Sequence, residues 1–285
     1  MAQQKHLQSI CMKNKRLLEF TAIMPVYNGS VANEVEQAIE SLLKQSLLPD
    51  KIIIVIDGPI SKKVETLLEK YLKYENRITK KVLDKNSGRG FARNFGALEV
   101  KSEFIAIMDS DDISRFDRFE KQIKIMRENN IDLLGGAIEE FEKFPGDLGQ
   151  VRRLPAMHEN IKSIAPFKTP YNNVTIMFRN ELFKKIKGYN DFNFVEDWDF
   201  AVRALASGAI FYNMPEVLVD VRINKKRSYN LKYLSEELLL ITDLKKKLST
   251  PYHIMFLSCF LRVVKALLPL ALLDVIYSKT LRKKI

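Results

Sequence analysis

The chain has 285 residues, of which 46% are hydrophobic and 28% are charged, and its formal net charge is +11. This composition is typical of a globular protein with a buried core, and it excludes a disordered, collagen-like or repeat-array protein. Two cysteines are too few for a disulfide framework, and the first twenty residues lack the apolar run of a secretory signal, so we expect a cytoplasmic protein.

Strands and helices alternate along the first half of the chain. Apolar runs predict strands over residues 20–26, 51–56, 78–83, 104–108 and 131–138. The segments between them predict helices over residues 33–46, 62–72, 90–99 and 115–129. Because the strands are continuously apolar rather than alternating, they indicate a parallel sheet covered by helices on both faces. In such folds ligands bind at the carboxyl ends of the strands.

The pattern is looser after about residue 150. It predicts short strands over residues 174–178, 210–212 and 217–221, and helices over residues 197–207 and 231–248. A mostly apolar segment follows over residues 253–277. We therefore divide the chain into an N-terminal extension (1–19), an α/β domain (20–225) and a C-terminal, basic, helical segment (226–285).

Two carboxylates follow the apolar strand at residues 104–108. In extended chain, Asp109 and Asp111 would point to the same side. Two such carboxylates can share Mg²⁺ or Mn²⁺, which prefer oxygen ligands and leave positions for phosphate oxygens. The alternative is an Asp-rich turn in which Asp112 or Ser114 caps the next helix.

Five motifs occur in one order along residues 20–225. They are MPVYN (24–28), IDGP (56–59), GRGFARN (88–94), MDSDD (108–112) and VEDWD (195–199). Together they resemble family 2 glycosyltransferases, which implies a GT-A (Rossmann-like) fold with a mixed, mainly parallel sheet. The stretches DRFEKQ, GGAIEEF, TIMFRN and MPEVLVDVR are most similar to bacterial enzymes that assemble capsule, exopolysaccharide or O-antigen repeat units.

The resemblance implies a set of residues that bind the nucleotide-sugar donor. They are Pro25, Tyr27, Asn28, Asp57, Arg93, Ser110, Trp198 and Arg222. Pro25 and Tyr27 would lie against the base, and Asp57 would hydrogen-bond the base or the ribose. Arg93 would face the diphosphate or the ribose, and Arg222 is a further candidate for the diphosphate. The alternatives are a half-buried turn aromatic for Tyr27 and a solvated helix face for Arg93.

The resemblance also implies the catalytic pair. Asp197 would be the base of an inverting reaction, Glu196 would bind the acceptor, and Trp198 would offer a face for a sugar to stack on. Chemistry favours such a base, because direct displacement at the sugar C1 needs a carboxylate within hydrogen-bond reach of the acceptor hydroxyl. The alternative is that Glu196 and Asp197 only stabilise the start of the following helix.

The C-terminal segment concentrates positive charge. From residue 242 to residue 285, nine Lys or Arg residues stand against two Asp, an excess of seven. Arg262, Lys265 and Asp274 make a position across a bilayer costly, so an interfacial helix on an anionic membrane surface is favoured. The alternative is a helix that packs against the domain.

Together with these features, the resemblance implies an inverting, metal-dependent glycosyltransferase at the inner face of the cell membrane. It would transfer a sugar from a UDP-hexose or UDP-N-acetylhexosamine to a polyprenyl-diphosphate-linked saccharide and form a β-linkage. Transfer to a polyprenyl phosphate is an alternative. A basic nucleic-acid-binding module is another, but the strand-end carboxylates would repel nucleic-acid phosphates, so we expect no nucleic-acid partner.

Overall fold

A computed structural model describes residues 20–223, 231–268 and 283–284. Its strands are β1 (Phe20–Tyr27), β2 (Lys51–Asp57), β3 (Ile78–Leu83), β4 (Phe104–Ile107), β5 (Ile113–Ser114), β6 (Leu133–Phe141), β7 (Gln150–Arg152), β8 (Met177–Arg179), β9 (Phe211–Arg222) and β10 (Lys283–Lys284). Its α-helices are α2 (Ala32–Leu43), α3 (Lys62–Tyr74), α4 (Arg89–Ala97), α5 (Arg118–Glu128), α6 (His158–Ile164), α7 (Asn180–Lys185), α8 (Glu196–Ala206), α9 (Leu231–Leu248) and α10 (Tyr252–Leu267), and a 3-10 helix covers Asn173–Thr175.

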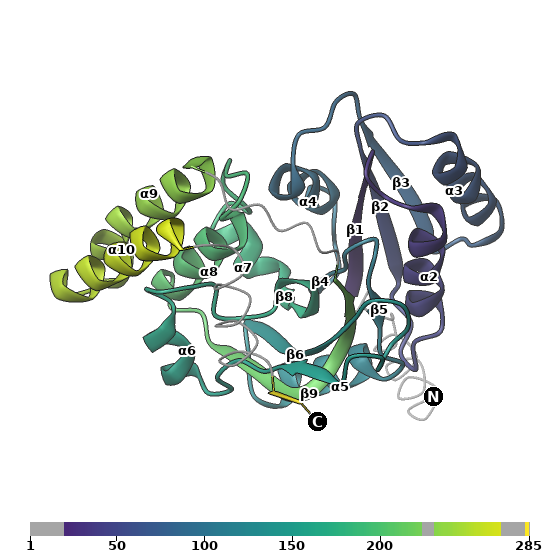
Figure 1. Cartoon of the computed structure of the whole chain (residues 1–285). Coiled ribbons are helices and arrows are strands. Elements are labelled where there is room, and N and C mark those ends of the chain that lie inside the picture. The colour runs from purple at the N-terminus through teal and green to yellow at the C-terminus, as the bar shows by residue number, and fades with distance from the viewer. Residues whose placement is uncertain (1–19, 224–230, 269–282, 285) are drawn as a thin grey trace, which may run out of the picture.

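The predicted parallel sheet forms the first half of the domain. Strand β1 pairs in parallel with β2 and β4, and β2 pairs in parallel with β3. Successive residues of β1 face opposite sides: Met24 packs with α2 and α3, whereas Ile23 packs with α4 and α8. Figure 1 shows α4 on one side of these strands and α2 and α3 on the other. Burial on both faces explains why the strands are continuously apolar.

The sheet becomes mixed in its second half. Strand β8 pairs antiparallel with β4 and β6, and β9 pairs in parallel with β6, so the order is β10-β7-β6-β8-β4-β1-β2-β3, with β9 beside β6 and β5. The prediction of two strands, 210–212 and 217–221, is wrong, because β9 is one strand. Its register shifts opposite Gly136 and Ala137, between Met214 and Val217. Pro215 lies in this irregularity, where a missing backbone donor is tolerated.

Helices α9 and α10 pack beside α8 at one end of the molecule (Figure 1). Trp198 and Val202 of α8 form a small core with Leu240 and Leu244 of α9. The predicted apolar segment 253–277 is helical to Leu267, and its remainder from residue 269 lies outside the described residues. No helix in the described part of the chain is long and apolar enough to cross a membrane. The N-terminal extension also lies outside the described residues.

Candidate active site

The Asp-rich loop follows β4 and is held by the end of β9. Strand β4 ends at Ile107, so Asp109 lies just beyond the strand and Asp111 lies in the turn that follows. The backbone N–H of Arg222 donates to Asp112 Oδ1 at 2.9 Å, and Arg222 Nε donates to the Asp111 carbonyl at 3.2 Å. Arg222 therefore holds the loop from the β9 side, and its contact with a diphosphate stays a prediction.

The alternative prediction, that Asp112 or Ser114 caps the next helix, is wrong. Ser114 lies in β5, where its hydroxyl accepts from Gln45 Nε2 at 3.3 Å. Helix α5 begins later, at Arg118, with Asp117 at its N-cap and no side-chain cap hydrogen bond. The carboxylate of Asp112 is buried against Arg222 instead. Neither Asp112 nor Ser114 caps a helix, which leaves Asp109 and Asp111 without a capping explanation.

Asp109 and Asp111 fit a cation that takes only part of its ligands from protein. Burial and the neighbouring charge of Asp109 raise the pKa of Asp111 to about 6. A divalent cation between the two carboxylates would remove that repulsion. Within the described ranges, no group of three or more His, Cys, Asp or Glu side chains could hold a metal ion. Mg²⁺ fits this arrangement, because it is commonly bound through one or two carboxylates together with substrate phosphates.

Arg93 bridges the Asp-rich loop and the start of α8. Its Nη2 donates to Asp109 Oδ1 at 3.1 Å, and its Nη1 donates to Glu196 Oε1 at 3.3 Å. The side chain is 0% exposed, and its guanidinium lies 5.6 Å from the ring centroid of Tyr189. The prediction that Arg93 faces the diphosphate or ribose is therefore corrected. Burial against two carboxylates makes Arg93 a positioning residue.

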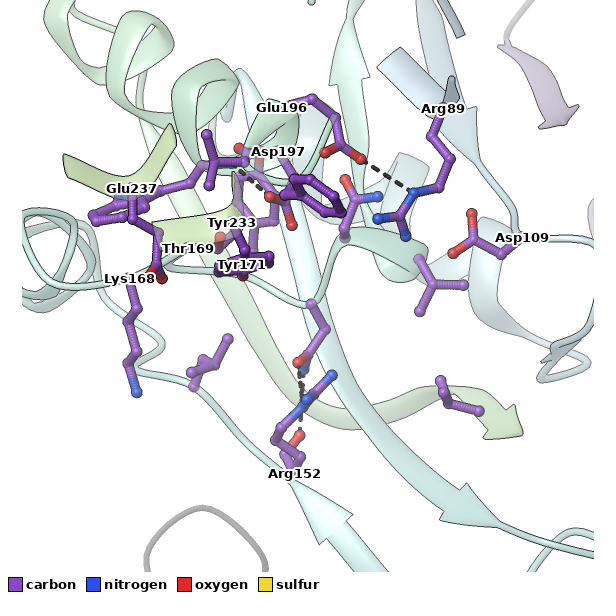
Figure 2. Close-up of a pocket in the computed structure, with 18 of the residues that line it drawn as sticks. Arg89, Asp109, Arg152, Lys168, Thr169, Tyr171, Glu196, Asp197, Tyr233 and Glu237 are labelled. Carbon is purple, nitrogen blue, oxygen red and sulfur yellow. Dashed lines mark hydrogen bonds and ion pairs between the residues drawn. The ribbon is translucent and has the colours of Figure 1, made fainter. Parts of the chain in front are cut away.

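Glu196 and Asp197 are the first two residues of α8. The carboxylate of Glu196 is buried and also lies 3.4 Å from Arg89 Nε, as the dashed line in Figure 2 shows. Asp197 Oδ1 accepts from the backbone N–H of Trp198 at 2.7 Å. Burial and the charge of Glu196 raise the pKa of Asp197 to about 6. A carboxylate with a pKa near neutrality is suited to general base catalysis.

One cavity of about 330 Å³ joins the two groups of carboxylates. Its lining includes Asp109 from the loop after β4 and Glu196 and Asp197 from α8. Figure 2 shows Arg89 between Glu196 and Asp109, with all three around the same space. The predicted metal ligand and the predicted base, which are far apart in sequence, thus lie in one pocket.

The residues predicted to contact the base lie at the ends of β1 and β2, outside that cavity lining. Tyr27, 48% exposed, and the exposed Asn28 follow the half-buried Pro25. The Tyr27 ring covers Gly29, where a Cβ would lie 2.5 Å from the ring. Tyr27 therefore offers an open aromatic face. Ser110 is buried and shares a hydrogen bond of 3.1 Å with Ser30, which ties the loop after β4 to the loop after β1.

Asp57 has a structural use that the sequence does not reveal. It pairs in register with Tyr27, but its side chain is buried. Its two carboxylate oxygens accept from the backbone N–H groups of Ser87 at 2.7 Å and Gly88 at 3.1 Å. Gly88 has φ +90°, a conformation that favours glycine, and precedes α4. Asp57 therefore holds this turn, and its expected contact with base or ribose stays a prediction.

Trp198 is not available as an open stacking face. It is 2% exposed, its Nε1 donates to the Ala165 carbonyl at 2.6 Å, and the guanidinium of Arg262 lies 4.9 Å from its ring centroid. A sugar could stack on Trp198 only if Arg262 moved. The structure therefore corrects the predicted role: Trp198 is a core residue that supports the pocket wall.

Several cations that line the cavity were not predicted as site residues. They are Arg89, Arg152, Lys168, Arg262 and Lys265. They come from α4, β7, the loop after α6 and α10, so no single short motif contains them all. Only Arg89 carried a signal, because it belongs to the GRGFARN motif.

The sheet, the Asp-rich loop and the carboxylate pair define a glycosyltransferase of the GT-A class. The crystal structure of S. aureus TarS 1-349 in complex with UDP-GlcNAc superposes with a TM-score of 0.66 over 85% of this chain and 70% of that chain. Its sequence identity is 17%, so this likeness shows the fold. A TarS structure with UDP gives a TM-score of 0.63.

Sequence comparison gives the family. The model of glycosyl transferase family 2 matches residues 21–187, and the chain belongs to this family. The UDP-Gal:alpha-D-GlcNAc-diphosphoundecaprenol beta-1,3-galactosyltransferase of Escherichia coli is 29% identical over 93% of this chain and 97% of its own. The amylovoran biosynthesis glycosyltransferase AmsE of Erwinia amylovora is 31% identical over 91% and 98%. The O-antigen biosynthesis glycosyltransferase WbnJ of Escherichia coli is 31% identical over 82% and 91%.

Proposed function

We propose that this glycosyltransferase transfers a hexose or N-acetylhexosamine from UDP to a hydroxyl of a polyprenyl-diphosphate-linked saccharide. The observation that carries the proposal is the shared cavity of Asp109, Glu196 and Asp197. Support for the acceptor comes from a relative named for a diphosphoundecaprenol substrate and from others named for amylovoran and O-antigen biosynthesis. Bacterial surface polysaccharide synthesis is the corresponding role.

The proposed donor end consists of the Asp-rich loop and the open face of Tyr27. Asp109 and Asp111 would hold Mn²⁺ or Mg²⁺, which would neutralise charge on the departing diphosphate. Tyr27 would stack on the base, since its ring is exposed and backed by Gly29. Arg93 keeps Asp109 oriented from the buried side.

At the acceptor end, Asp197 would take the proton from the attacking hydroxyl. The acceptor oxygen forms a bond to the sugar C1 as the bond from C1 to the donor diphosphate breaks, and the proton passes to Asp197. A single displacement inverts the anomeric centre, so an α-linked donor gives a β-linked product. Glu196 is tied to Arg93 and Arg89, so it holds the start of α8 and fixes Asp197 beside the reacting atoms.

The test is transfer by the purified full chain with MnCl₂. A panel of UDP-sugars is offered with N-acetylglucosamine linked through diphosphate to a short lipid, and with a polyprenyl phosphate alone. We expect a disaccharide on diphosphate, with a β-linkage by NMR and no product in EDTA. A sugar phosphodiester formed on polyprenyl phosphate would instead support the alternative enzyme. Absence of product with every donor and acceptor would contradict both.

We also propose that α10 attaches the enzyme to an anionic membrane surface. Its outward face is apolar, with Phe256 76% exposed and Phe260 and Leu267 also exposed. The opposite side packs on α9 and lines the cavity with Arg262 and Lys265. Such a helix combines the two sequence alternatives: it packs against the domain and keeps an apolar face for an interface. A lipid-linked acceptor would then enter from the surface on which α10 lies.

A further inference from the structure

The pocket in Figure 2 has two ends of opposite charge. One end contains Asp109, Asp112, Glu196 and Asp197 together with Arg89. The other contains Arg152, Lys168, Arg262 and Lys265 together with Glu237. The buried Glu140 also lies 4.0 Å from Arg152 Nη1, so four cations stand against two carboxylates, an excess of two positive charges. Figure 2 shows Lys168 and Glu237 across the space from Arg89 and Asp109. The chemistry proposed above uses only the acidic end.

Among the cations of this end, Lys168 has the charge that the surrounding protein compensates least. It is half-buried in the loop after α6, and in the described part of the chain no carboxylate forms an ion pair with it. Burial and the positive charges of Arg152 and Arg262 lower its pKa. The fold thus holds a third cation beside two others. An anionic ligand would offset this repulsion.

The neighbouring cations are fixed in place by the fold. Arg262 donates to the Phe167 carbonyl, and its Nε lies 3.0 Å from Glu237 Oε1. The same Glu237 oxygen lies 3.8 Å from Lys265 Nζ. Glu237 is one carboxylate shared by two cations, so it cannot neutralise the whole group. The resulting site is positive and organised before a ligand arrives.

We infer that this cationic end binds the diphosphate of the lipid-linked acceptor, while the sugar of that acceptor reaches Asp197 at the acidic end. The inference rests on the proposed function. A diphosphate diester carries two negative charges, which match the positive excess. The donor diphosphate has a different place, at the cation held by Asp109 and Asp111. Helix α10 supplies Arg262 and Lys265 and also the exposed apolar face, so the lipid that follows the diphosphate would meet that face directly.

The first test measures equilibrium binding of decyl diphosphate to the full chain in EDTA, where no cation occupies the Asp-rich loop. We expect Lys168→Gln to weaken binding by about tenfold, the loss of one charged hydrogen bond. Lys162→Gln, which removes an exposed lysine of α6 outside the cavity lining, is the matched control and should bind as wild type does. Decyl phosphate should bind more weakly than decyl diphosphate. UDP affinity in MnCl₂ should be equal for wild type, Lys168→Gln and Lys162→Gln. This measurement also checks that the variants are folded.

Two results would overturn the inference. One is equal binding of decyl diphosphate by wild type and Lys168→Gln. The other is weaker UDP binding in Lys168→Gln, which would assign the cations to the donor. The proposed function can fail while this inference holds. In that case decyl diphosphate binding would depend on Lys168 but no sugar transfer would be found, which would indicate a lipid-diphosphate site on a chain with another activity. Where transfer occurs, Lys168→Gln should raise KM for the diphosphate acceptor about tenfold and leave kcat unchanged.

Discussion

Arg93 Nη1 lies 3.3 Å from Glu196 Oε1, and both side chains are buried although 103 positions separate them in the sequence. This ion pair joins α4 to α8, and through Asp109 it also reaches the loop that would hold the cation. A movement of the Asp-rich loop or of the start of α8 would therefore displace the Arg93 side chain. The two halves of the proposed reaction, departure of the diphosphate and activation of the acceptor, therefore depend on one buried guanidinium.

Removing that guanidinium should destabilise the fold. Arg93→Met leaves the buried Glu196 carboxylate without its buried partner, and breaking one side of such a pair costs about 3–5 kcal/mol. Urea unfolding should show this loss in the free energy of unfolding. Arg89→Met removes an arginine that pairs with the same oxygen but has a side chain 60% exposed, so it should cost less than about 1 kcal/mol. Equal losses of unfolding free energy in the two variants would mean that the buried ion pair stabilises the fold no more than the exposed one.

Asp111→Ala should weaken metal-dependent donor binding. Without that carboxylate the cation keeps one protein ligand, and we expect UDP-sugar affinity in MnCl₂ to fall by about a hundredfold, in the range that loss of a metal-supporting group produces. Isothermal titration with and without EDTA measures the difference. Asp191→Ala is the control, since Asp191 is exposed and does not line the cavity. If Asp111→Ala binds UDP-sugar as tightly as wild type with metal present, the cation is not held there.

Asp197→Asn should separate catalysis from donor binding. The amide keeps the shape of the side chain but cannot accept the proton, so kcat should fall by about 10²–10⁴. The Kd for UDP-sugar should stay within twofold of wild type, because the proposed donor contacts come from the Asp-rich loop and Tyr27 and not from Asp197. Asp191→Asn is the matched control. A retained kcat would assign the proton transfer to another group.

The pH dependence follows from the raised pKa of Asp197. Below about pH 6 the carboxyl is protonated and cannot act as a base, so kcat/KM should rise with pH and level off above about pH 6. The profile should be measured at saturating MnCl₂, because a bound cation keeps Asp111 ionised. Asp197→Asn should lose this acid limb. A profile that is flat from pH 5 to pH 8 would argue against Asp197 as the base.

Substitutions on the outer face of α10 should release the protein from membranes. Truncation after Leu248 is a poor test, because it would also remove Arg262 from Trp198 and open the pocket. Phe256→Glu with Phe260→Glu changes only exposed positions and should reduce flotation with phosphatidylglycerol vesicles several-fold, since apolar area and charge both contribute. Tyr74→Glu, an equally exposed aromatic on α3, is the control. Unchanged flotation of the double variant would contradict attachment through α10.

The first half of the fold and one helix of the C-terminal segment were predicted well. Residues 78–83 and 231–248 coincide with β3 and α9, and the other predicted parallel strands differ by one to three residues at their ends. Continuous apolar runs ended by turn residues are strong signals where a strand is buried on both faces. The second half was harder because its strands are short and β9 contains Pro215, which divides the apolar pattern without dividing the strand.

Motifs located the site but not the use of each side chain. Of the carboxylates that the motifs indicated, Asp109, Glu196 and Asp197 do share a cavity. The buried position of Arg93 and the turn held by Asp57 depend on partners far along the chain, which spacing does not report. The cationic end could not be predicted for the same reason, since Lys168 and Arg262 come from different elements.

One consequence of α10 concerns how the enzyme would find its substrate. The same helix forms the wall of the pocket and the apolar outer face. A chain anchored by that face searches a leaflet in two dimensions, with its pocket mouth held at a constant height above the lipid headgroups. The rate of transfer would then depend on the surface density of the acceptor. Assays with dispersed acceptors would therefore give a lower rate than the enzyme reaches at a membrane.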